Sequence, residues 1–280
     1  MKIKNVLTGM IAFVILGTAG VIGYGVSTTE NDIQNFERQI SELSLRHPVE
    51  YTMADVQGVP EPVQRYFNFT FNKGTISISS VELSAEGDFR RPLTDTFNET
   101  SANQTIAIGT PALMFSANTP LIPGIWARAY DYYAEGQMEM KAKVLSVLTV
   151  VDEKESEELN QISLRRWLLE SALYPASLLP GGPVSWEAID NHTAKATVSS
   201  GGTSASMVAV FDSTGRMTEM YAEEDGDLNT PYHGSGEHVS RFDYKPVQGM
   251  MIPHSFVISR MAEGVKHPFW RGNITQITYK

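Results

Sequence analysis

The segment Arg165–Gly182, RRWLLESALYPASLLPGG, is the part of the sequence on which the fold assignment depends. Proline lacks an N–H and its ring crowds the preceding turn, so we expect a helix here to bend or end near Tyr174, just before Pro175. Ser163 is a candidate N-cap. The pattern therefore predicts a helical insert at about residues 160–180. The residues that share one face at helical spacing are Leu164, Trp167, Leu168, Ser171 and Pro175.

Short segments of alternating polarity lie on both sides of this insert and predict strands. Before it come TISISSVELSAEGDF, with a shift near Ser79–Ser80 that suggests a bulge, then QTIAI, ALMFSA, IWARAYDYY and MEMKAKVLSVLTVV. The acidic run Asp152–Leu159 is expected to be a solvated loop. After the insert come TAKATVSS, SASMVAVFD, RMTEMYAEE, GEHVSRFDYKP, MMIPHSFVISR and FWRGNITQITY, separated by tight turns. Consecutive strands joined by such turns form an antiparallel meander.

The predicted fold class is mainly β, a β-rich α+β arrangement. We expect a curved antiparallel sheet or half-barrel covered by the helical insert, with an N-terminal transmembrane helix. The charged residues Arg165, Arg166 and Glu170 are expected at the rim of the insert. An exposed Arg166–Glu170 pair would contribute only a few tenths of a kcal/mol. The apolar plug itself is predicted to consist of Leu164, Trp167, Leu168, Leu178 and Leu179.

An uncharged segment at the N-terminus indicates a membrane anchor. Val6–Val26 contains no charged residue, and at about 1.5 Å per helical residue it is roughly 31 Å long, enough to cross a bilayer. A cleaved signal peptide is the alternative. Lys2 and Lys4 before the segment, and an acidic flank after Ser27, predict a cytoplasmic N-terminus and an extracytoplasmic or periplasmic body.

The predicted organisation has four parts. Residues 1–5 are cytoplasmic, residues 6–26 are the single-pass anchor, residues 27–58 are a juxtamembrane helix and linker, and residues 59–280 form one extracytoplasmic β-rich domain. The juxtamembrane helix, about Thr29–Leu45, is expected to pack on the body, and homodimerisation through it is the alternative. Pro60 and Pro62 mark the start of a second short helix. The juxtamembrane helix carries one apolar stripe of Ile33, Phe36, Ile40 and Leu43.

Composition excludes some classes of protein. The formal net charge of −10 and the lack of a Lys/Arg cluster argue against a nucleic-acid partner. The chain has no cysteine, so it forms no disulfide. A body of about 250 residues can build a stable core without one.

Several short sequence motifs, taken together, resemble those of a family of membrane-anchored prokaryotic proteins that carries only a domain-of-unknown-function label. These motifs are VPEPVQRYF from Val59, GDF from Gly87, RRWLLESALYPASLLP from Arg165, SWE from Ser185, PYHGSG from Pro231, GMMIPHSF from Gly249 and FWRGNI from Phe269. The resemblance implies no established activity and no cofactor. A more distant similarity is architectural, to the half-barrels of lipoprotein-localisation factors (LolA-like), which hold acyl chains between sheet and helices.

Two clusters of residues are candidates for a reactive site. His233, Glu237 and His238 lie within the word HGSGEH, where the two glycines favour a polar loop over a zinc site, so no metal is predicted. Asp131 and Glu135 would be an acid–base pair only if they shared a desolvated cleft, whereas DYYAEG is typical of a hairpin turn. We assign no catalytic residue.

Aromatic and leucine residues are the better candidates for a site, because an incompletely filled bowl would leave an apolar cavity. We therefore expect the body to bind a lipid or another apolar small molecule between sheet and helices. The alternatives are an envelope structural or interaction protein without a cavity and, ranked last, a hydrolase. Arg65, Arg166 and Glu170 are expected to be structural polar residues. The predicted cavity lining is Trp126, Tyr130, Trp167, Leu168, Tyr174, Leu178, Trp186 and Trp270.

Overall fold

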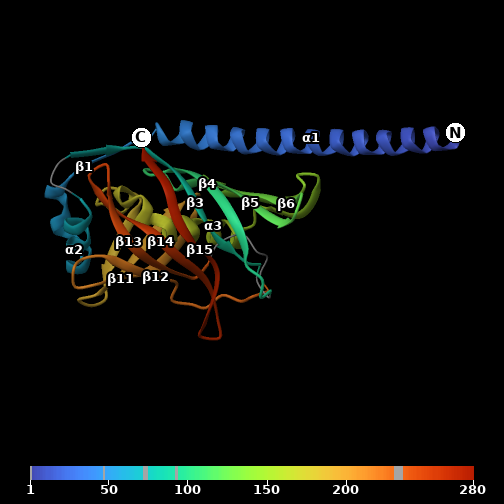
Figure 1. Ribbon diagram of the computed structural model, residues 1–280. Helices are drawn as coiled ribbons and strands as arrows, with labels where there is room; N and C mark the ends of the chain where they lie inside the picture. Colours follow the sequence, from blue (N-terminus) through green and yellow to red (C-terminus); the bar gives the residue numbers. More distant parts are fainter. Residues whose placement is uncertain (1, 47, 72–74, 92–93, 230–235) are drawn as a thin grey trace.

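The computed structural model describes residues 2–46, 48–71, 75–91, 94–229 and 236–280. Within these ranges it describes all side chains except those of residues 2–7, 9–12, 49–55, 75 and 76. About half of the residues lie in strands, and most of these strands form one open antiparallel sheet (Figure 1). Few helices accompany the sheet, in agreement with the predicted mainly β class. The prediction of a β-rich antiparallel architecture is therefore confirmed.

The thirteen described strands of this sheet follow the order β8-β7-β6-β5-β4-β3-β15-β14-β13-β12-β11-β10-β9. The chain therefore runs from the middle of the sheet to the edge strand β8, crosses to the other edge strand β9, and returns to the middle, where β15 pairs with β3. The strands of the first half are β3 (Ser80–Phe89), β4 (Asn98–Ala107), β5 (Ala112–Ile122), β6 (Ile125–Ala134), β7 (Gln137–Val144) and β8 (Leu148–Lys154). Those of the second half are β9 (Val184–Ala188), β10 (Thr193–Ser200), β11 (Thr203–Phe211), β12 (Met217–Tyr221), β13 (His238–Val247), β14 (Met250–Ala262) and β15 (Val265–Tyr279).

The crossing between the two edges is the helical insert. It consists of α3 (Glu157–Glu170) and the 3-10 helices η2 (Ser171–Leu173) and η3 (Pro175–Leu178). The helix therefore ends before Tyr174 and Pro175, as predicted. Its start was predicted wrongly, because the N-cap is Ser156 rather than Ser163: Leu159 N donates to Ser156 Oγ at 3.1 Å. The acidic run Asp152–Leu159 is not the predicted loop: Asp152–Lys154 end β8, and Glu157 and Glu158 lie in the first turn of α3, where negative charge is favourable against the helix dipole.

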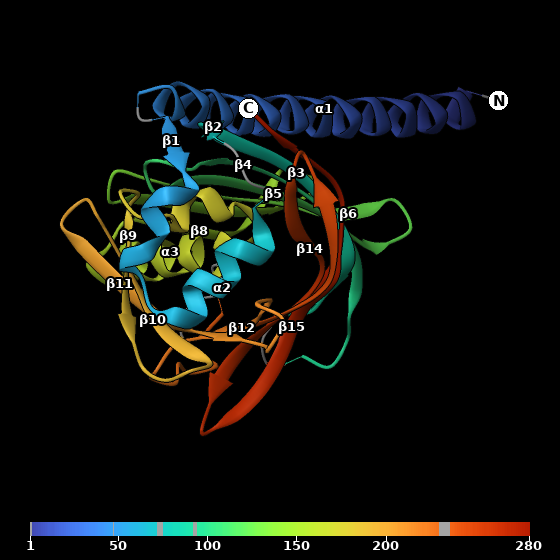
Figure 2. The same ribbon diagram turned by 90° about the vertical axis from the view of Figure 1, so that its left-hand side faces the viewer.

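The sheet is curved and encloses α3 on its inner face, while the C-terminal part of α1 (Lys2–Ser44) lies across its outer face and the N-terminal part extends beyond the body (Figure 1 and Figure 2). Both faces are therefore partly covered. The larger apolar core fills the space between the inner face and the insert. A smaller core lies between α1 and the outer face, where Ile33, Ile40 and Leu43 meet Met114 and Tyr130. The packing of this part of α1 on the body follows the prediction.

Two predicted strands divide differently in the structure. The segment from Thr75 does not form one bulged strand, because β2 (Thr75–Ile78) pairs with β1 (Val49–Thr52) in a separate two-stranded sheet before β3 begins. The segment MEMKAKVLSVLTVV is a hairpin, with a turn at Leu145 and Ser146, whose φ angles are 55° and 58°. Apolar residues continue to alternate with polar ones through both turns. The alternation alone therefore did not show where one strand ends and the next begins.

The remaining elements lie across one open end of the curved sheet (Figure 2). They are η1 (Met53–Gly58) and α2 (Glu61–Thr70), which begins after Pro60 and buries Val63, Tyr66 and Phe67. This agrees with the predicted second helix. Among the residues whose side chains the structure describes, no helix is long and apolar enough to cross a membrane.

Candidate functional site

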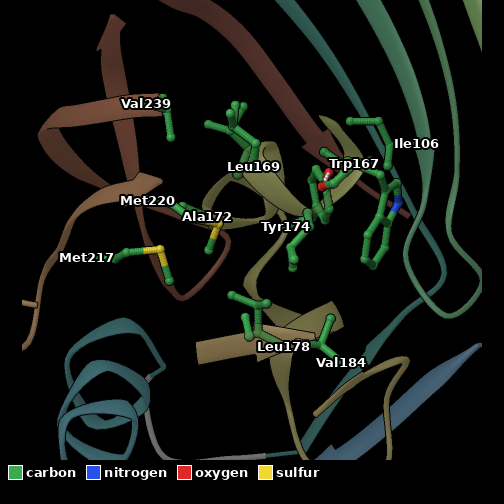
Figure 3. Packing of buried hydrophobic residues seen from close by; sticks show 14 of the residues in the cluster. Ile106, Trp167, Leu169, Ala172, Tyr174, Leu178, Val184, Met217, Met220 and Val239 are labelled. Atoms are coloured by element: carbon green, nitrogen blue, oxygen red, sulfur yellow. Dashed lines mark hydrogen bonds between the residues drawn. The ribbon is translucent and has the colours of Figure 1, made fainter. Parts of the chain in front are cut away.

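The insert fills the inner face of the sheet as the plug that the sequence predicted. Leu164, Trp167, Leu168, Leu178 and Leu179 are all buried. Figure 3 shows Trp167 beside Ile106 of β4 and Leu178 beside Val184 of β9. The site where sheet and helices meet is therefore a packed interface.

Hydrogen bonds from large aromatic side chains fix the plug to the sheet. Trp167 Nε1 donates to Ala107 O at 3.2 Å, and Tyr279 OH donates to Leu173 O at 2.5 Å. Trp186 Nε1 donates to Leu178 O at 2.9 Å. Because indole and phenol groups need partners when buried, these bonds specify the position of the plug as well as stabilise it.

Arg166 and Glu170 lie in the interior, which corrects the prediction that they would sit at the rim of the plug, whereas the side chain of Arg165 is 21% exposed. Arg166 and Glu170 are each only 3% exposed, and Arg166 donates to the buried carboxylate of Asp131. Arg166 Nε also lies 3.4 Å from Glu170 Oε1, and its guanidinium is 4.4 Å from the centroid of the Phe115 ring. Arg165 pairs with buried Glu237 at 2.8 Å. Sequence reasoning did not identify the partner of Arg166, because Asp131 is 35 positions away along the chain.

A second arginine completes the buried charge cluster. Arg241 on β13 donates to Leu169 O at 3.4 Å and lies beside Glu170, Gln104 and Trp270 around an enclosed space of about 10 Å³. Such a space is about the size of one water molecule. In the described chain, Glu170 Oε2, Gln104 Oε1 and Arg241 Nε are buried without a hydrogen-bond partner. The interface therefore contains a polar core of two arginines and two carboxylates, with some of its bonding capacity unused.

Burial shifts the titration of carboxyl groups in and beside this cluster. Desolvation raises the pKa of Asp131 to about 6, although adjacent Arg166 acts in the opposite direction. Desolvation and the nearby Asp131 raise the pKa of Glu153 on β8 to about 7. Both groups therefore change charge nearer to neutral pH than exposed carboxyl groups do.

The structure divides the eight predicted lining residues between the two faces of the sheet. Tyr130 lies in the outer core under α1, and Trp126 lines an outer-face hollow together with Val26. They cannot line an inner cavity, which corrects that part of the prediction. Trp167, Leu168, Tyr174, Leu178 and Trp270 belong to the inner core, and Trp186 packs against it.

The remaining candidates do not converge on a reactive centre. Arg65 on α2 lies at the surface, where it pairs with Glu61 at 3.0 Å. Asp131 is buried under Arg166, which corrects its expected place in a hairpin turn, whereas Glu135 occupies the exposed β6–β7 turn. The described residues thus give this pair no shared cleft.

The second cluster, HGSGEH, likewise forms no metal site in the described chain. His233 lies outside the described residues. Glu237 accepts from Arg165 at 2.8 Å and from Met261 N at 2.8 Å, while His238 Nε2 contacts Glu219 at 2.8 Å. Glu237 and His238 therefore have different partners. No group of three metal-ligating side chains occurs among the residues that were described.

Comparison with known proteins identifies the family. A family model described as "Family of unknown function (DUF6920)" matches residues 57–279, so the chain belongs to this family. No curated protein and no solved structure matches the chain significantly.

Proposed function

We propose that this member of the family is a membrane-tethered interaction module of the cell envelope, whose solid body is held outside the cytoplasm by the N-terminal part of α1. The observation that carries the proposal is the continuity of α1. A single helix runs from the uncharged segment Val6–Val26 into the segment that packs on the sheet.

The exposed side chains of α1 support a lipid environment. These side chains face water unless lipid covers them. Moving apolar surface from water into lipid is favourable by roughly 25 cal/mol per Å². Lys2 and Lys4 precede the segment, in agreement with the positive-inside rule. The large apolar side chains of α1 that are 56–79% exposed are Phe13, Val14, Ile15, Leu16, Val21 and Tyr24.

The docked part of α1, from Thr29 to Leu43, packs on the sheet and supports a fixed orientation of the body relative to the tether. Arg128 donates to both carboxylate oxygens of Glu30, at 2.7 and 3.0 Å, and Lys143 Nζ donates to Thr29 Oγ1 at 3.1 Å. Ile40 is fully buried against the sheet. Because the helix continues without a break, body and tether are expected to move as one unit, unlike a domain on a flexible linker.

The packing of the interior favours binding at the surface. Ligand pockets are typically about 300–1,000 Å³, whereas the enclosed space beside the plug is about 10 Å³. A partner of this module would therefore bind an outer surface.

The tether is tested by membrane extraction of the full chain after expression in a bacterium. We expect it to float with membranes and to resist alkaline carbonate. The double substitution Val14→Arg and Ile15→Arg should release it, since each arginine near a helix centre costs about 2.5–3.5 kcal/mol of insertion energy. The matched control places arginine at exposed Gln34 and Asn35 of the docked part, and this variant should be retained. Release of the unsubstituted chain by carbonate would contradict the proposal.

A second candidate function is binding of an apolar ligand in the bowl after displacement of the plug. The observation that favours it is the set of unpartnered polar atoms where plug and sheet meet, on Glu170, Gln104 and Arg241. Each such atom costs roughly 1–3 kcal/mol, which reduces the cost of opening. The expected likeness to half-barrels of lipoprotein-localisation factors points the same way at the level of fold only.

A fatty acid with a photoreactive acyl chain separates the two candidates. Irradiation of the purified full chain with this probe, followed by peptide mass spectrometry, should label residues 160–180 and 256–274 if the bowl accepts the chain. Labelling confined to residues 6–26 would leave the surface module as the function and remove the second candidate.

A further inference from the structure

Two neighbouring hairpin tips at one end of the body expose large apolar side chains. The tips are joined by a hydrogen bond in which Leu145 N donates to Trp126 O at 2.9 Å. Five apolar residues at these tips are 43–63% exposed. Two of them belong to the β5–β6 tip, and three belong to the β7–β8 tip and the start of β8. We call these residues the tip patch: Leu121, Ile122, Val147, Leu148 and Val150.

The tip patch differs from ordinary hairpin turns. Turns are usually built from Gly, Pro, Asn, Asp and Ser, and single exposed apolar residues among them are normal. Two other hairpins follow that norm, with Ile189 beside the β9–β10 turn at 51% exposure and Val265 at the β14–β15 turn at 53%. A cluster of five indicates an interaction surface.

The tip patch lies where the uncharged segment of α1 ends. A Cβ built on Gly25 would lie 2.5 Å from Ser146 O and 2.9 Å from Val147 Cγ2, so α1 touches the β7–β8 turn directly. Val26 and Trp126 line the same outer-face hollow, of about 360 Å³. Figure 1 shows the β5–β6 hairpin extending beside α1 toward its N-terminal half.

We propose that the tip patch inserts into the headgroup region of the bilayer, as a second membrane contact of the body. This inference rests on the proposed function, because it takes Val6–Val26 as the spanning segment. The lipid interface would then surround α1 near Val26 and would meet both tips at the same depth.

The residues around the tip patch fit this occupant. Trp126 and Tyr24 flank the tips, Tyr24 is 74% exposed, and both side-chain types favour the membrane–water interface. Interfacial segments typically bury their apolar faces about 5–10 Å deep, within reach of hairpin tips. A protein partner or a second copy would instead have to compete with the bilayer for this surface, since the spanning helix brings lipid to the patch.

Spin labels on the full chain test the insertion. The chain has no cysteine, so Ile122→Cys and Leu148→Cys each create a single labelling site. Val265→Cys and Ile189→Cys, exposed on other hairpins, are the matched controls. The full chain is reconstituted in vesicles of phosphatidylcholine and phosphatidylglycerol. Collision of the nitroxide with oxygen and with a water-soluble nickel complex is then measured.

We expect the ratio of oxygen to nickel accessibility at positions 122 and 148 to be at least threefold higher than at positions 265 and 189. Equal ratios at all four positions, in chains that float with the vesicles, would overturn the insertion while leaving the tether intact. Chains that fail to float would overturn both. Spin–spin broadening at position 122 that disappears on dilution with unlabelled chain would assign the patch to a second copy instead.

Discussion

The buried pair of Arg166 and Asp131 is the contact most open to a quantitative test. With Glu170 and Arg241 it forms a cluster of two positive and two negative groups, all about 2–3% exposed. Arg166→Met or Asp131→Asn each leaves this cluster with one unbalanced buried charge. Breaking a buried pair in this way typically costs about 3–5 kcal/mol, whereas the whole stability of an ordinary domain is about 5–15 kcal/mol.

The double substitution Arg166→Met with Asp131→Asn should cost much less than the sum of the singles. It removes one charge of each sign, so Glu170 and Arg241 remain as a balanced pair. We expect a coupling energy of at least about 2 kcal/mol, near the upper end of the range for residues in contact. The assay is urea unfolding of the full chain in mild detergent, followed by tryptophan fluorescence, with all four members of the cycle.

The matched control is the exposed pair of Arg271 and Asp88, which are 3.1 Å apart with side chains 54% and 41% exposed. The equivalent cycle there should give a coupling below about 1 kcal/mol. Additive effects at Arg166 and Asp131, with no more coupling than in the control, would refute the balanced cluster.

Three further predictions concern stability. Because burial raises the pKa of Glu153 from 4.5 to about 7, the folded state should lose stability as pH rises through that window; Glu153→Gln should reduce this fall in melting temperature, and the part that remains below about pH 6 should come from Asp131, whose pKa is raised to about 6. Gly25→Leu should lower the melting temperature, since its Cβ would meet a carbonyl of the β7–β8 turn at 2.5 Å, whereas Gly23→Leu, with nothing within 4 Å, should not. Ile40→Ala should destabilise by about 2–5 kcal/mol, because the side chain is fully buried, while Leu45→Ala, at a site 74% exposed, should leave the urea midpoint unchanged.

Local patterns in the sequence predicted most of the elements and much of the packing, but not the start of α3 or the division of two predicted strands. Alternation of polar and apolar residues predicted the strands, and Pro175 predicted where the plug helix ends. Trp167 and its leucine neighbours were predicted to be buried, and the stripe on α1 was predicted to pack on the body. These properties follow from helical and strand periodicity, which places residues on one face whatever the rest of the chain does.

The tertiary structure alone decided which apolar residues face the inner core, which face the outer core, and which charged groups are paired. Tyr130 and Asp131 point to opposite faces of β6, but both faces are covered, so alternation could not tell the inner core from the outer one. Arg166 is buried because a strand 35 positions earlier brings Asp131 to it. The sequence by itself determined a β-rich body with a plug and an apolar N-terminal segment. The charge cluster and the tip patch arise only when distant segments meet, because ion pairing and exposure depend on position in space rather than on order along the chain.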